Sequence, residues 1–172
     1  ELFKMSNVPF CHLHVHSSYS LLDSTIKIKD LIATAKKMKM SHLALTDHAV
    51  LYGAVEFYNA ATSAGIKPII GCDMYIAKHG IEAKNSQRDN MSLVLLAENQ
   101  TGYDNLVKLV SESHLNGFYY KPRVDKSILR KYSEGLIALS GDIRGEVNDA
   151  CRSDNLESAE NLILEYIDIF GK

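Results

Sequence analysis

The stretch FCHLHVH, residues 10–16, places three imidazoles at alternate positions of an apolar run. Successive side chains of a β-strand point to opposite faces, so a strand here puts His12, His14 and His16 on one face. A single histidine in a strand usually makes hydrogen bonds and binds nothing. Three on one face, followed by acidic residues, form the mixture of nitrogen and oxygen donors that divalent transition metals bind. The stretch therefore predicts a first strand that carries part of a metal site.

Strand-type apolar runs alternate with helix-period segments along the rest of the chain. Further strands are expected in four apolar runs: 42–46 (HLALT), 67–76 (KPIIGCDMYI), 92–97 (SLVLLA) and 136–140 (LIALS). Apolar residues at helical spacing predict five helices, near 28–38, 54–64, 101–110, 127–132 and 154–170. Capping boxes are expected at Thr101 with Asp104 and at Asp154 with Glu157. The polar segment 77–90 is predicted to be a loop.

The alternation of elements predicts an α/β fold. Because the strands are almost continuously apolar, we expect a parallel sheet that is covered on both faces. The carboxyl ends of parallel strands meet at one rim, where barrel enzymes build their sites. Polar residues lie at these strand ends, and they are expected to meet around one metal cluster: His14, His16, Asp47, His48, Asp73 and Asp142.

Bulk composition limits the classes of function. The chain has 172 residues, 46% hydrophobic residues and a formal net charge of -2, which favours one globular domain and argues against an electrostatic DNA clamp. Its three cysteines, Cys11, Cys72 and Cys151, are scattered, as is typical of a reducing compartment. No run has the length and apolarity of a membrane span or a secretory signal. We expect a cytoplasmic protein with no membrane partner.

Longer motifs resemble a known family. HVHSSYSLLD (14–23), TDH (46–48) and YGAVEFYNAATSAGIKPIIGCDMYIA (52–77) resemble the PHP domain, the polymerase and histidinol phosphatase module. More narrowly, GFYYKPRVDKSIL (117–129) and SEGLIALSG (133–141) resemble the N-terminal domain of the bacterial DNA polymerase III alpha subunits. The similarity extends over nearly the whole chain.

The resemblance implies a distorted (β/α)₇ barrel. A rim cluster of zinc, manganese or iron in such barrels activates water and holds phosphate oxygens. Only about five βα units with parallel strands are expected here, so the chain is interpreted as one truncated PHP domain over 1–172. Residues 1–8 are interpreted as a tag or an alternative start. The rest of the barrel and the polymerase domains are expected to be absent from the sequence.

The resemblance also implies roles for individual residues. Asp47 is expected to be a ligand or a partner that orients an imidazole. His12 aligns with a family histidine that is not a ligand. The implied metal ligands are His14, His16, Asp23, His48 and Asp73.

Departures from the family pattern predict a weakened site. Ser92 stands where related sequences read YHLVLLA with a ligating histidine, and a hydroxyl is a poorer zinc ligand than imidazole. Asp142 stands where the family usually has the cysteine of LSGC, and a carboxylate there suits a hard cation such as manganese. The late Asp-x-His motif of the family does not occur before Lys172. We therefore expect zinc or manganese at reduced occupancy.

The implied parent protein is a replicative DNA-directed DNA polymerase, a nucleotidyltransferase whose polymerase chemistry lies in other domains. Two roles remain open for the domain itself. One is a structural role in bracing the polymerase and docking the proofreading exonuclease subunit, which Ser92 favours. The other is metal-dependent 3′–5′ exonuclease or phosphoesterase activity. The longer matching blocks disfavour a third role, that of a stand-alone histidinol-phosphatase-like hydrolase. Expected partners are the remainder of the alpha chain, other replicase subunits and, through the parent protein, DNA.

Two further features have alternative interpretations. Lys121 and Arg123, beside Tyr119 and Tyr120, could contact a phosphate or a single DNA strand. A solvated loop packed by its own aromatic residues is the favoured alternative. Cys72 adjoins a candidate ligand in the sequence, but neighbouring residues of a strand point to opposite faces, so Cys72 is expected in the core.

Overall fold

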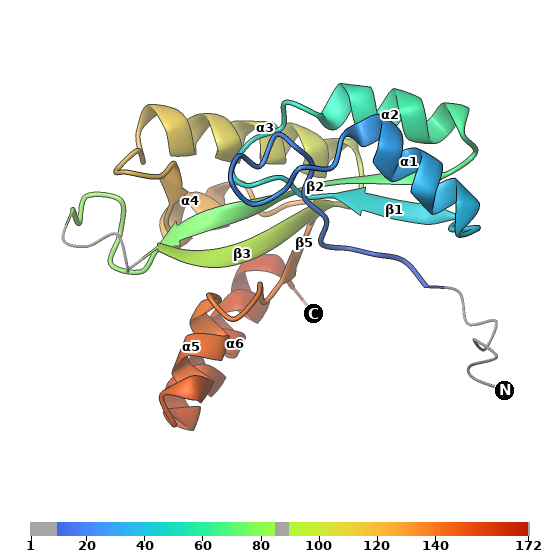
Figure 1. Ribbon diagram of the computed structural model, residues 1–172. Coiled ribbons are helices and arrows are strands. Elements are labelled where there is room, and N and C mark those ends of the chain that lie inside the picture. Colours follow the sequence, from blue (N-terminus) through green and yellow to red (C-terminus); the bar gives the residue numbers. More distant parts are fainter. Residues whose placement is uncertain (1–9, 85–89, 172) are drawn as a thin grey trace, which may run out of the picture.

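The computed structural model describes residues 10–84 and 90–171, and within these ranges five strands form one sheet (Figure 1). The path of the sheet is β1-β2-β3-β5, and β4 pairs with β2. The strands are β1 (His42–Leu45), β2 (Lys67–Ala77), β3 (Asn90–Ala97), β4 (Arg123–Val124) and β5 (Leu136–Leu139). The helices are α1 (Ile28–Lys37), α2 (Ala54–Ser63), α3 (Gln100–Leu115), α4 (Lys126–Lys131), α5 (Glu146–Arg152) and α6 (Leu156–Phe170). The predicted α/β class is confirmed.

The sheet is mixed, which corrects the expectation of parallel strands throughout. β1 and β4 run parallel to β2, but β2 pairs with β3 and β3 pairs with β5 in antiparallel registers. A continuous apolar run indicates that a strand is buried on both faces, but it does not indicate whether the strand runs parallel or antiparallel to its neighbours. In addition, no helix occurs between β2 and β3 in the part of the chain that the structure describes, whereas a parallel pair needs a long crossover connection.

Residues 10–16 do not form the predicted first strand. The segment lies along β1, where the Ala44 amide donates to the His12 carbonyl at 3.0 Å and the Thr46 amide donates to the Val15 carbonyl at 2.8 Å. The Val15 amide bonds the Thr46 hydroxyl at 2.9 Å instead of a strand carbonyl, so no regular ladder develops. The exposed His12 ring packs edge-on against Phe10, with ring centres 4.7 Å apart, away from the histidine pair that follows.

All five predicted helices occur, but two of them, α3 and α6, begin at other capping residues than predicted. The Asn99 side chain accepts from the Gly102 amide and starts α3, in place of the predicted Thr101–Asp104 box. Asn155 similarly starts α6 in place of Asp154. Helix α5 was not predicted, because its seven residues carry little apolar periodicity. The predicted loop is observed over 78–84, and its remainder at 85–89 lies outside the described residues.

Two large apolar clusters hold the layers together, and a small third one joins β1 to β3. One joins α1 and α2 to β1 through residues such as Ile28, Leu43 and Phe57. The other lies between β2, β3 and the helices α3, α4 and α6: Cys72, Met74, Ile76, Leu93, Leu95, Leu106, Leu109 and Leu129. Cys72 is fully buried there, as predicted. Helices α5 and α6 project from the sheet as a pair next to β5 (Figure 1).

Across residues 10–84 and 90–171, none of the helices combines the length and the apolar character that a bilayer span requires.

Candidate metal centre

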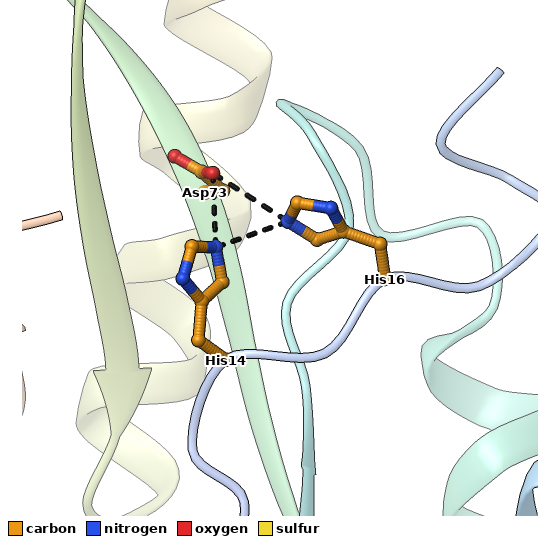
Figure 2. A group of neighbouring side chains, drawn as sticks. All are labelled: His14, His16 and Asp73. Carbon is orange, nitrogen blue, oxygen red and sulfur yellow. Dashed lines mark hydrogen bonds and ion pairs between the residues drawn. The ribbon is translucent and has the colours of Figure 1, made fainter. Parts of the chain in front are cut away.

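Asp73 lies at the centre of the candidate site. Its buried carboxylate projects from β2 toward the segment that precedes α1, and Oδ2 lies 3.1 Å from His14 Nε2 and 3.5 Å from His16 Nε2 (Figure 2). The two imidazole nitrogens are 3.1 Å apart. All three donor atoms lie within 4.8 Å of one another, a separation that allows them to ligate one metal ion.

His48 adds a third imidazole. Its side chain is 7% exposed, with Nδ1 at 3.2 Å from Asp73 Oδ2 and Nε2 at 3.4 Å from Asp23 Oδ2. Neither ring nitrogen has a hydrogen-bond partner among the described residues. Leaving buried polar atoms without partners is costly, and a cation bound between the imidazoles and carboxylates would satisfy the His48 nitrogen that carries the lone pair. The residues therefore fit a divalent metal ion, although the structure does not indicate which one.

The backbone around His48 is fastened to β2. The Asp73 amide donates to the Asp47 carbonyl at 3.1 Å, and the Ala49 amide donates to the Asp73 carbonyl at 2.9 Å. Ala49 has a φ of 51°, a left-handed conformation that few non-glycine residues adopt. Its carbonyl lies 2.9 Å from Nε2 of His114 on α3. These contacts fix the backbone of Ala49, the residue after His48, and so orient the His48 side chain.

Asp47 has a different role from the predicted one. Its buried carboxylate accepts from the Ser17 amide at 2.6 Å, the Ser17 hydroxyl at 2.7 Å and the Ser20 hydroxyl at 2.6 Å. Among the residues that the structure describes, its carboxylate accepts hydrogen bonds from serines and not from an imidazole. Asp47 therefore holds the turn that follows His16, which differs from both expected roles, that of a metal ligand and that of a partner that orients an imidazole.

Ser92 and the histidines determine the charge of Asp73. Burial of the carboxyl raises its pKa, but the hydrogen bonds with His14, His16 and Ser92 outweigh burial and hold the pKa well below its ordinary value. Burial lowers the pKa of His48, despite the opposing effect of Asp73. An ionised carboxylate beside a neutral imidazole is the pairing of protonation states that metal ligation requires.

The structure does not bring Asp142 into the group formed by His14, His16 and Asp73. Its Oδ1 accepts from the Arg144 amide at 2.7 Å, and its Oδ2 lies 3.1 Å from the Arg144 guanidinium. The predicted ligand is therefore engaged with an arginine in this arrangement. A carboxylate, unlike the thiolate usual at this position in the family, forms a strong ion pair with a neighbouring guanidinium. Arg144 follows Asp142 by only two residues, and this spacing was the sequence signal that could have predicted the pair.

Arg123 is buried, so it fits neither the candidate contact with a phosphate nor the favoured alternative of a solvated loop. It is 2% exposed, and its guanidinium donates to the backbone carbonyls of Gly117, Ala83 and Ile81 at 3.1, 3.1 and 2.8 Å. Lys121 differs, because it is exposed and places Nζ 5.3 Å from the ring centre of Tyr75. Sequence reasoning overlooked Tyr75, although it lies two residues after Asp73 on the same face of β2.

The fold and the side-chain group define an α/β domain suited to a divalent metal ion. The family model of the PHP domain matches residues 12–172, and the chain belongs to the PHP domain family. This match confirms the resemblance drawn from the sequence motifs.

Curated relatives are longer proteins. The DNA polymerase III subunit alpha of Borreliella burgdorferi is 53% identical over 165 residues, which cover 94% of this chain and 14% of that protein. The DNA polymerase III subunit alpha of Thermus aquaticus is 44% identical over 172 residues, which cover 96% of this chain and 14% of that protein. The chain thus spans about one seventh of these relatives. Among solved structures, an amidohydrolase from Chromobacterium violaceum has a TM-score of 0.45 and 24% identity, over 60% of this chain and 32% of that one.

Proposed function

We propose that this chain is the PHP domain of a bacterial DNA polymerase III alpha subunit and takes part in DNA replication. The identity to such subunits, at 53% and 44% over almost the whole chain, supports this assignment. The nucleotidyltransferase chemistry then belongs to other domains of the same polypeptide. The remainder of that polypeptide is the first partner of the domain, and DNA, the proofreading exonuclease subunit and other replicase subunits are further partners through it.

Within that setting, we propose that the domain binds a divalent cation through His14, His16, His48 and Asp73, with Asp23 at its exposed side. The observation that carries this proposal is the buried His48 ring, whose two nitrogens have no hydrogen-bond partner among the described residues and lie 3.2 and 3.4 Å from carboxylate oxygens. Imidazole-rich donor sets suit zinc, and manganese is the alternative that the carboxylates would accept.

The reaction that this centre supports best is metal-dependent hydrolysis of a phosphoester, with 3′–5′ exonuclease activity as one form. A bound divalent ion supplies Lewis acidity for phosphate oxygens and water. The side chains of the protein supply the ligands and leave access for a substrate. Asp73 is held ionised by His14, His16 and Ser92, while the 31% exposed His14 and the 47% exposed Asp23 leave one side open to solvent.

A structural role is the second candidate. Ser92 favours it, because its hydroxyl donates to Asp73 Oδ1 at the position where related sequences have a ligating histidine. With one ligand fewer, a bound ion would serve to fix the segment that carries His14 and His16 against β2. The domain would then brace the polymerase and offer a docking surface to the proofreading exonuclease subunit.

Metal analysis of the intact protein separates these possibilities. After dialysis against zinc or manganese, we expect bound metal in the wild type and in His12→Ala, at the occupancy that a site with one ligand fewer allows, but loss of metal in His16→Ala and Asp73→Asn. His12→Ala is the matched control, because His12 is exposed and lies outside the group. Equal metal content in all four proteins would refute the proposed centre. Stoichiometric metal without any release of nucleotides from single-stranded DNA would favour the structural role.

A further inference from the structure

The imidazole of His48 lacks a hydrogen bond that would fix its orientation. Its side chain is 7% exposed, and neither ring nitrogen has a hydrogen-bond partner among the described residues. A histidine that binds a metal usually donates its other ring N–H to a carboxylate, a carbonyl or water, and this bond sets the orientation of the ring. His48 therefore depends on packing against neighbouring side chains to hold its ring in a position that allows metal binding.

Two aromatic rings contact His48. The centre of the His16 ring lies 4.1 Å away, with the planes inclined by 50°. The centre of the Tyr75 ring lies 5.7 Å away, and the planes are inclined by only 16°, so these two rings are stacked. His16 is itself a candidate ligand and belongs to the irregular segment before α1, whereas Tyr75 belongs to the sheet. Tyr75 is therefore the neighbour that can hold the plane of the imidazole.

The backbone of Tyr75 is fixed by strands on both sides. Tyr75 pairs with Ser92 of β3 and with Arg123 of β4. It follows Asp73 by two residues, so both side chains project from the same face of β2. The sheet thus places the Tyr75 ring next to the buried carboxylate at the centre of the site.

A tight turn places Lys121 over the Tyr75 ring. The Tyr119 amide donates to the Lys121 carbonyl at 3.0 Å, and Tyr120 between them has a φ of 58°. The turn is followed at once by Arg123, the residue that pairs with Tyr75. The Lys121 ammonium lies 5.3 Å from the centre of the Tyr75 ring. A cation at this distance is attracted to the face of an aromatic ring, so Lys121 restrains the ring that stacks on His48.

We infer that the Tyr75 ring positions the His48 imidazole for metal binding and that Lys121 restrains this ring. The inference rests on the proposed function, because His48 is a ligand of the proposed metal centre. Tyr75 acts through His48, which makes it a positioning residue. Removal of its ring should change the surroundings of His48 even in the protein without metal, and it should weaken the binding of metal that is supplied.

Nuclear magnetic resonance of the intact protein in EDTA tests the stacking without any metal. The ring protons of His48 are assigned by comparison with His48→Gln. An aromatic ring shields protons that lie over its face, so we expect the His48 resonances to move downfield in Tyr75→Leu. They should stay at their wild-type positions in Tyr75→Phe, which keeps the ring, and in the control Tyr58→Leu, which changes an exposed tyrosine on α2. Unchanged His48 resonances in Tyr75→Leu would overturn the inference.

Zinc affinity, measured by competition with a chromogenic chelator, tests the consequence for metal binding. The free energy of a stacked aromatic pair corresponds to a factor of about twofold to tenfold in affinity, so Tyr75→Leu should bind zinc more weakly by this factor. Tyr75→Phe and Tyr58→Leu should bind zinc as the wild type does. If Tyr75→Phe bound zinc as weakly as Tyr75→Leu, the ring would not be the group responsible and the inference would be wrong.

Lys121→Met tests the restraint of the ring with a variant that leaves the sheet untouched, because Lys121 is exposed. Loss of the cation should weaken zinc binding by about twofold to fivefold while Tyr75 is present, and it should have no such effect in Tyr75→Leu. The loss of a positive charge near a metal ion would, by itself, strengthen zinc binding in both backgrounds. Stronger binding in both would therefore refute the role of Lys121. Lys37→Met, which changes an exposed lysine on α1, is the matched control.

The two proposals fail separately. If the wild type took up no zinc, the metal centre would be refuted, and the resonances in EDTA would still decide whether Tyr75 stacks on His48. If the wild type bound zinc and Tyr75→Leu bound it equally well, the positioning role of Tyr75 would be refuted and the metal centre would stand.

Discussion

The Ser92 hydroxyl donates to Asp73 Oδ1 at 2.7 Å, while the other oxygen of this carboxylate faces three imidazoles. Ser92 reaches Asp73 from the neighbouring antiparallel strand, where it pairs with Tyr75, the next residue on the same face of β2. The serine therefore assigns different roles to the two carboxylate oxygens. One accepts a hydrogen bond from the protein, and the other is left for a cation.

Replacing Ser92 by histidine is expected to strengthen metal binding. The change adds an imidazole donor next to Asp73, and imidazole is a better ligand than a hydroxyl for zinc. We expect a gain of about tenfold or more in zinc affinity, measured by competition with a chromogenic chelator. Ser92→Ala is the comparison variant, because it removes the hydroxyl without adding a ligand. If Ser92→His bound zinc no better than Ser92→Ala, the proposed geometry of the centre would be wrong.

Arg123 is expected to govern stability and not ligand binding. Its buried guanidinium satisfies three backbone carbonyls, and Arg123→Ala would leave them without partners. We expect a loss of about 2–4 kcal/mol in the free energy of unfolding, measured with urea. Zinc content after dialysis should stay unchanged in the folded variant. An Arg123→Ala protein as stable as the wild type would contradict this structural role.

The sequence predicted the candidate ligands better than it predicted the sheet. His14, His16 and His48 could be identified as candidates because they lie in short contiguous motifs, whereas Asp73 lies within the apolar run that forms β2 and is its buried acidic residue. Strand direction could not, because an apolar run reports burial and is the same in parallel and antiparallel sheets. The position of Arg123 depends on partners that tertiary folding supplies, whereas Asp142 pairs with Arg144, only two residues away. No local pattern distinguishes an arginine that binds buried carbonyls from one that binds a phosphate.

Lys126 is expected to stabilise the contact between α4 and the helix pair α5 and α6. Its ammonium lies 2.7 Å from Glu165 and 3.1 Å from the buried Glu146, which also accepts from the Tyr166 hydroxyl at 2.7 Å. Burial lowers the pKa of Lys126, but the two glutamates outweigh burial and raise it above its ordinary value. Lys126→Met should therefore lower the free energy of unfolding by about 1–2 kcal/mol at neutral pH.

The pH dependence of this effect follows from the raised pKa. The stabilisation is complete below the ordinary lysine pKa of about 10.4 and is lost as the pH rises through the higher folded value. Urea unfolding of wild type and Lys126→Met should thus give a constant difference near neutral pH and a smaller one in strong alkali. Lys37→Met, on the exposed side of α1, serves as the control and should show little difference at any pH. A Lys126→Met protein as stable as the wild type at neutral pH would contradict the role of this cluster.

His114 is expected to act on the metal centre through Ala49. Its Nε2 lies 2.9 Å from the Ala49 carbonyl, and Ala49 is the left-handed residue that follows His48. His114→Leu removes the donor, so the backbone after His48 should relax and zinc affinity should fall by about threefold to tenfold. His114→Gln keeps a donor at this position and should restore most of the affinity. If His114 only contributed to overall stability, both variants would unfold at a lower midpoint and His114→Gln would bind zinc no better than His114→Leu. Tighter zinc binding by His114→Gln than by His114→Leu would therefore show that His114 positions His48.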